Sequence, residues 1–65
     1  MNVTLFTYRG YKITVRDADT PTPSVAVFYG CDGLFETTSW SQAVQWVDAY
    51  IKGEQWAIDA KLGNN

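Results

Sequence analysis

Five residues near the C-terminus are spaced alternately three and four positions apart, and this spacing constrains the chain more than any other feature. They are Trp46, Ala49, Gly53, Trp56 and Ala60. If residues 40–62 form one helix, all five lie on one side of it. A more apolar set lies on another side and comprises Trp40, Ala43, Val44, Val47, Tyr50, Ile51, Ile58 and Leu62. Because a helix in a small monomer needs only one buried stripe, the second stripe predicts contact with another molecule.

Gly53 is the point at which this helix either ends or continues. Glycine suits the left-handed residue that follows a helix, and Lys52 is favourable in a last turn. Continuation costs about 1 kcal/mol, but Ile58 and Leu62 stay in phase with the apolar stripe before the glycine. We therefore predict one helix over 40–62, about 34 Å long against about 20 Å for a six-residue strand. Its last turns would overhang a sheet and leave Ile58 and Leu62 uncovered.

Four short segments before this helix have the composition of strands. They are rich in β-branched and aromatic residues or alternate between apolar and polar residues, and they span 3–8, 11–16, 25–29 and 34–37. Arg9-Gly10 predicts a two-residue hairpin that pairs Tyr8 with Tyr11 and Phe6 with Ile13. Its turn type stays open, because arginine is not favoured at positive φ.

The remaining signals complete a single α+β domain over residues 1–65. Residues 17–24 contain both prolines and predict a loop. Residues 30–33 predict the turn of a second hairpin, with Asp32-Gly33 as its strongest element. Ser39 and Gln42 match a capping box at a helix start. The predicted fold is a four-stranded antiparallel sheet of two hairpins, packed on one face by a C-terminal helix in the order ββββα.

The size and composition exclude several classes of protein. A chain of 65 residues has marginal stability. Because Cys31 is the single cysteine and the sequence has no histidine, neither an internal disulfide bond nor a structural zinc site can stabilise it. Oligomerisation is the remaining common remedy. The net charge of −2, with five scattered basic residues, does not suit a nucleic-acid surface. No signal peptide or membrane span is expected, and a lone cysteine fits the cytoplasm.

Catalytic and cofactor chemistry has little support in the sequence. Cys31 stands beside Asp32, whose charge disfavours a thiolate. Asp17 and Asp19 lack the remainder of a calcium loop, and Gly30-x-x-Gly33 lacks the following helix of a phosphate loop. We predict no enzyme activity, no catalytic residues, no cofactor and no metal.

The aromatic residues of the strands leave a second possibility open. Tyr8, Tyr11, Phe28 and Tyr29 are candidates for stacking on single-stranded bases, although a small core needs the same residues. The outline, a small sheet with one capped helix, resembles that of many small bacterial and bacteriophage proteins. No motif in it is specific enough to transfer a function.

The Trp46–Trp56 stripe has three interpretations: a flank of the main stripe at a sheet edge, a self-association face, or a docking face for another protein. Tryptophan is enriched at interface hot spots. We predict a non-enzymatic interaction module that forms a homodimer through its C-terminal helix. The predicted interaction residues are Trp46, Ala49, Gly53, Trp56, Ala60, Ile58 and Leu62. The alternatives are a monomeric inhibitor or adaptor of another protein and a nucleic-acid accessory protein.

Overall fold

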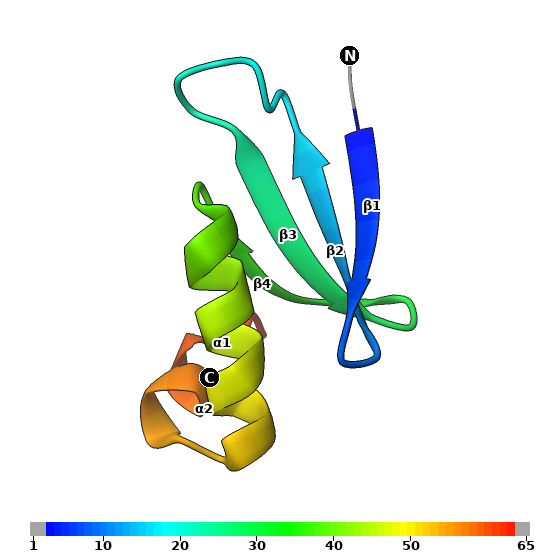
Figure 1. Cartoon of the computed structure of the whole chain (residues 1–65). Coiled ribbons are helices and arrows are strands. Elements are labelled where there is room, and N and C mark those ends of the chain that lie inside the picture. The colour runs from blue at the N-terminus through cyan, green and yellow to red at the C-terminus, as the bar shows by residue number, and fades with distance from the viewer. Residues whose placement is uncertain (1–2, 64–65) are drawn as a thin grey trace.

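The computed structural model describes residues 3–63 and contains a four-stranded antiparallel sheet followed by two helices (Figure 1). The strands are β1 (Val3–Tyr8), β2 (Tyr11–Arg16), β3 (Ser24–Tyr29) and β4 (Asp32–Thr37), and the helices are α1 (Trp40–Lys52) and α2 (Gln55–Ala60). The strand order is β1-β2-β3-β4, so each strand pairs with its neighbours in the sequence. This is the predicted α+β arrangement with one additional short helix.

The first hairpin has the predicted register. Tyr8 pairs with Tyr11 and Phe6 pairs with Ile13. Arg9 and Gly10 have φ values of 51° and 86°, and two positive φ angles define a type I′ turn, whose twist matches that of the strands. Arg9 therefore occupies the left-handed region at some cost in backbone energy.

The core lies between one face of the sheet and α1. Ile13, Val25 and Val27 have no more than 1% of their surface exposed and face Ala43 and Val47 of α1. The alternation of apolar residues along β2 and β3 places these side chains on one face. Figure 1 shows α1 on the β4 side of the sheet, with β1 farthest from it.

The prediction of a continuous helix over 40–62 is wrong. Gly53 adopts a left-handed conformation with φ 80° and ends α1. Its N–H donates to the carbonyl of Tyr50 at 3.1 Å, and the Glu54 N–H donates to the carbonyl of Ala49 at 2.9 Å. These two bonds form a Schellman motif, which satisfies the last carbonyls of the helix. At 13 residues, α1 is about 20 Å long and matches the strands without overhang.

Trp46 is the side chain against which the chain folds back after Gly53. Its ring is fully buried and stacks on Phe35 and Tyr50, with ring centroids at 5.1 and 4.6 Å. Its indole Nε1–H donates to the carbonyl oxygen of Ala57 in α2 at 2.9 Å. Ala57 is itself fully buried. The indole thus holds α2 against the C-terminal end of α1.

A β-bulge in β4 turns an additional residue toward the core. Val27 pairs with Phe35, whereas Phe28 pairs with Gly33, so Leu34 is the additional residue on β4. Leu34 is buried, and its carbonyl accepts a 2.8 Å hydrogen bond from the backbone N–H of Leu62. The bulge therefore supplies a core side chain and an attachment point for the segment after α2.

The N-terminus of α1 has half of the predicted capping box. The Ser39 side chain accepts a hydrogen bond from the Gln42 N–H at 3.4 Å. The Gln42 side chain instead accepts a bond from the hydroxyl of Thr37 at 2.6 Å. The helix start is consequently tied to the end of β4.

The two tryptophans of the predicted stripe provide a matched test of this packing. We expect Trp46→Phe to lower the free energy of unfolding by about 2 to 4 kcal/mol, because it leaves a cavity and an unpaired Ala57 carbonyl. Trp56→Phe, at an exposed position, should change it by less than about 0.5 kcal/mol. Urea unfolding followed by circular dichroism measures both values. Equal costs for the two variants would contradict the assigned role of Trp46.

Candidate interaction surface

The seven predicted interaction residues do not lie on one side of a single helix. Trp46 and Ala49 are buried in the core, Ile58 is half-buried, and the exposed members are Gly53, Trp56, Ala60 and Leu62. The left-handed turn at Gly53 changes the direction of the chain, so the spacing of the stripe no longer corresponds to one surface.

The outer side of α2 retains one exposed aromatic ring of that stripe. Trp56 is 49% exposed, and its indole N–H donates to the Glu54 carboxylate at 2.8 Å. On the same short helix, the Gln55 amide donates to the Asp59 carboxylate at 2.8 Å. Trp56 therefore lies among polar groups that already have partners within the chain.

An uncovered apolar surface runs along β1. Every residue from Val3 to Thr7 is exposed, and Leu5 is 60% exposed. The side chains of Val3 and Leu5 lie on the face of the sheet opposite α1, whereas Phe6 lies on the α1 face, beside Ile13. β1 thus carries exposed apolar side chains on both of its faces.

A shallow hollow adjoins β1 on the α1 face. It has a volume of about 470 Å³ and is lined by Thr4, Phe6, Val15, Ala18 and Trp40. The rings of Phe6 and Trp40 meet edge to face with centroids 4.8 Å apart, and each remains more than 40% exposed. The hollow therefore extends the apolar surface of β1 toward the start of α1.

The two edges of the sheet differ in their protection. β4 carries the bulge and the charged Glu36, and its Leu34 carbonyl is bonded to the segment after α2. Bulges, charges and covering segments are the usual means by which proteins protect sheet edges. The six residues of β1 include no charge, proline or glycine. β1 is therefore the edge that is open to a further strand.

Asp48 of α1 holds the β1–β2 hairpin in place. Its carboxylate accepts hydrogen bonds from the Tyr8 hydroxyl at 2.9 Å and from the Arg9 guanidinium at 2.8 Å. The contact between Arg9 and Asp48 is also an ion pair, and both side chains are partly exposed to solvent. The bond from Arg9, followed by the bond from Tyr8, lowers the pKa of Asp48 below its ordinary value of 3.8. The same contact raises the pKa of Tyr8.

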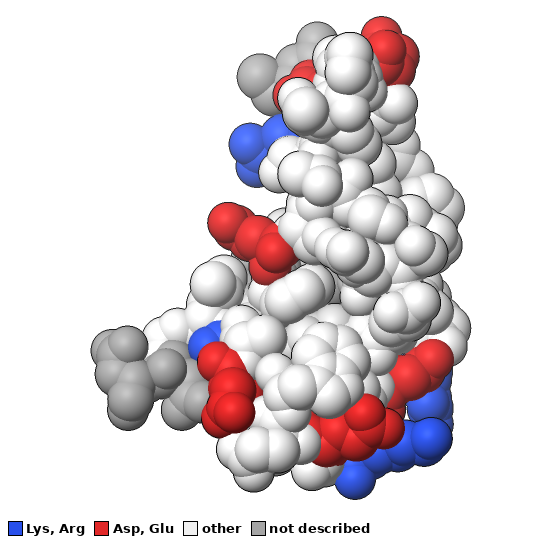
Figure 2. Space-filling view, turned by 90° about the vertical axis from the view of Figure 1, so that its left-hand side faces the viewer, with Lys and Arg blue, Asp and Glu red and all other residues white. Residues whose placement is uncertain are grey.

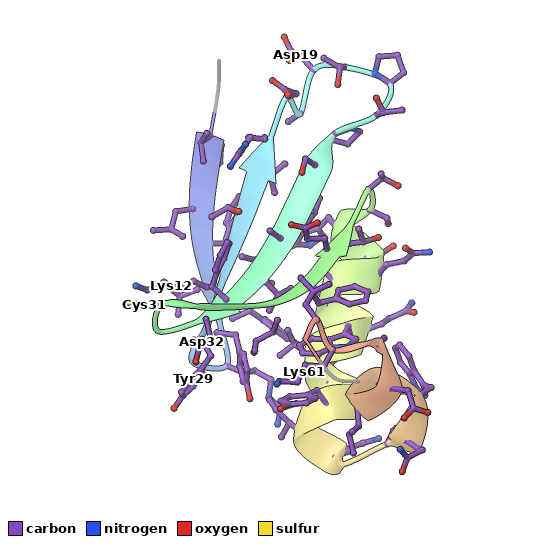
Figure 3. All side chains as sticks on the ribbon, turned by 180° about the vertical axis from the view of Figure 1, so that it is seen from behind. Lys12, Asp19, Tyr29, Cys31, Asp32 and Lys61 are labelled. Atoms are coloured by element: carbon purple, nitrogen blue, oxygen red, sulfur yellow. The ribbon has the colours of Figure 1, made fainter. Side chains whose placement is uncertain are left out.

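A second hollow lies at the other end of the sheet, between the β3–β4 turn, α1 and the segment after α2. Three tyrosines line it, Tyr11, Tyr29 and Tyr50, with Asp32 and Lys61 also in its lining. Tyr11 contacts both other rings, and burial raises the pKa of its hydroxyl. Figure 3 shows Tyr29 and Asp32 at this end, whereas Asp19 lies at the opposite end of the sheet.

The proposed nucleobase platform does not form as one surface. Tyr8 and Tyr11 lie opposite each other on the α1 face, and Tyr11 contacts Tyr29. Phe28 pairs with Lys12 on the other face of the sheet. On the side of the molecule drawn in Figure 2, basic side chains occupy small groups interspersed with acidic ones.

The part of the chain that the structure describes contains no group of three or more Cys, Asp or Glu side chains placed to hold a metal ion. Cys31 is exposed in the β3–β4 turn. Neither helix within residues 3–63 has the length and apolar character needed to cross a membrane. Comparison with family models, with curated proteins and with solved structures found no match.

The contact between Asp48 and the hairpin predicts a specific loss of stability in acid. Because the pKa of Asp48 is lowered by folding, its contribution is fully present above the unfolded value near 3.8 and disappears as the pH falls through the folded value. Asp48→Asn should therefore be less stable than the wild type at pH 6, and the difference should shrink as the pH falls below about 4.

Urea midpoints across this pH range measure the effect. Asp19→Asn, in the 17–23 loop, is the matched control for the loss of a carboxylate, because Asp19 lies at the other end of the sheet from the β1–β2 hairpin turn. A constant difference between Asp48→Asn and the wild type across the range would argue against this assignment.

Proposed function

We propose that the chain is a non-enzymatic protein-interaction module that forms a homodimer. The observation that carries this proposal is the set of exposed apolar side chains on both faces of the edge strand β1: Val3 and Leu5 on one face, and Phe6, beside Trp40, on the other. Exposed apolar side chains that gather at one place on a small protein usually mark contacts with other proteins.

The size of the domain supports a need for a partner. A chain of this length buries only roughly 60% of its unfolded surface. Among residues 3–63, the large apolar side chains that remain at least 42% exposed are Val3, Leu5, Phe6, Tyr29, Trp40, Ile51, Trp56 and Leu62. Half of these lie in β1 or contact it. Covering them would stabilise the fold by about 25 cal/mol for each Å² removed from water.

The surface favours a protein partner over the other classes. It is apolar, the net charge is −2, and no charged residue occurs within β1. A nucleic-acid partner would require basic groups near its phosphates. The absence of histidine in the sequence and the single exposed Cys31 support a role without catalysis. Action in the cytoplasm, where an exposed thiol stays reduced, is part of this proposal.

Sedimentation equilibrium tests the homodimer directly. We expect the weight-average mass to rise from 7.3 kDa toward twice that value with increasing concentration. We expect a dissociation constant on the order of micromolar, which corresponds to about −8 kcal/mol. The Trp56→Ala variant serves as a control, because the proposal assigns the contact to the β1 side, and it should dimerise like the wild type.

Two results would count against the proposal. A mass that stays at the monomer value up to millimolar concentration would defeat the homodimer and favour a monomeric adaptor. Loss of the dimer in the Trp56→Ala variant, with the fold intact by circular dichroism, would return the interface to α2.

A further inference from the structure

The outward-facing backbone groups of β1 follow from the geometry of its hairpin. In a two-residue hairpin the residues that flank the turn form a hydrogen-bonded pair, and the pairs alternate from there. Tyr8 and Tyr11 flank the Arg9-Gly10 turn. Tyr8, Phe6 and Thr4 therefore direct their N–H and C=O groups toward β2. Val3, Leu5 and Thr7 direct theirs outward, away from the sheet.

We infer that these outward groups bind the same groups of a second copy, so that two β1 strands pair antiparallel with Leu5 on the twofold axis. This inference rests on the proposed homodimer and names the surface that forms it. The two four-stranded sheets then become one continuous sheet of eight strands. An isologous contact of this kind is the commonest symmetry of soluble dimers.

The register around Leu5 satisfies every outward backbone group between Val3 and Thr7. Leu5 pairs with Leu5 of the second copy, and Val3 pairs with Thr7 in both directions. Each of these pairs exchanges two N–H···O=C bonds, because all its members face outward. Shifting the register by one residue would set outward groups opposite groups that are already bonded to β2. The chain is thus complementary to itself in this register.

The side chains of β1 suit the same pairing. On the face opposite α1, the two Leu5 side chains meet, each flanked by a Val3–Thr7 pair. On the α1 face, Phe6 lies opposite Thr4 of the second copy, and the two Phe6 rings lie diagonally within reach of each other. The pairing brings no like charges together, because β1 is uncharged.

The remainder of the fold leaves room for the second copy. Figure 1 shows α1 and α2 on the side of the molecule away from β1. The hollow beside Phe6 and Trp40 lies next to the strand and gives the added sheet an apolar neighbour on the α1 face. By contrast, the outer side of α2 offers no unpaired backbone edge, and the Trp56 indole already donates to Glu54.

Thiol cross-linking of single-cysteine variants tests this pairing. In a Cys31→Ser background, Leu5→Cys should be joined to a second copy in high yield by a short bifunctional thiol reagent. Residues directly opposite in a hydrogen-bonded pair have Cα atoms about 5.5 Å apart. Val3→Cys and Thr7→Cys are matched controls on the same strand face. Each lies about 14 Å from its own copy and should not cross-link alone, but an equal mixture of the two should.

The cross-linking and sedimentation results together distinguish the β1 pairing, its register and the homodimer. Efficient linkage of Leu5→Cys and of the mixture, without linkage of either control alone, supports it. A wild-type protein that dimerises by sedimentation while Leu5→Cys stays unlinked would overturn the β1 pairing and leave the homodimer intact. A wild-type protein that remains monomeric would defeat both. Linkage of Val3→Cys alone as efficient as that of Leu5→Cys would overturn the register.

A charge at the centre of the pairing provides an independent measurement. Leu5→Lys replaces a 60% exposed side chain, so the subunit should keep its fold and its circular dichroism spectrum. Two lysines at the axis would repel each other, and we expect at least a tenfold rise in the dissociation constant. Lys12→Ala, on the neighbouring strand and the same sheet face, is the control and should leave the constant within about threefold. An unchanged constant in Leu5→Lys would contradict the inference.

Discussion

The hydrogen bond from the Trp46 indole to the Ala57 carbonyl is the contact on which the shape of this domain depends. A buried indole N–H must find an acceptor, and in this chain the acceptor lies on a helix that follows a reversal at Gly53. The same ring stacks between Phe35 and Tyr50, so one side chain joins the sheet, α1 and α2. Trp46, Ala49 and Ala57 are consequently buried within the subunit, while Trp56 and Leu62 stay exposed.

The packing of the C-terminal segment determines which edge of the sheet is covered. The segment after α2 reaches β4 through the bond between Leu62 and Leu34, and this contact protects one edge of the sheet. No corresponding segment covers β1 within residues 3–63. Because the β4 edge is covered and the β1 edge is open, a further strand can add to the sheet only beside β1.

Most of the fold was predictable from the sequence, because local signals determine it. Strand alternation, the Arg9-Gly10 hairpin and the Ser39 cap gave the order of the elements and the first register correctly. The predicted turn over 30–33 was wrong in its bounds, because the turn occupies residues 30–31 and Asp32 and Gly33 begin β4. The prediction that the helix continues past Gly53 was wrong. The apolar residues on the two sides of Gly53 have the spacing of one helix, although the glycine ends α1 and reverses the chain. The spacing of apolar residues does not show that the buried Trp46 indole N–H takes its acceptor from Ala57 in a separate helix.

The edge position of β1 was not predicted, because strand order depends on tertiary contacts that the sequence pattern does not contain. Its apolar residues on both faces and its lack of charge were the available signal.

The bulge at Leu34 has a consequence for the evolution of β4. Strand segments ordinarily tolerate changes best at their ends, but here the additional residue inside the strand contributes a core side chain and the carbonyl that binds Leu62. Losing that one position would restore a regular ladder while removing both attachments at once. A one-residue deletion inside β4 would therefore cost more than one in the 17–23 loop, which holds no core side chain.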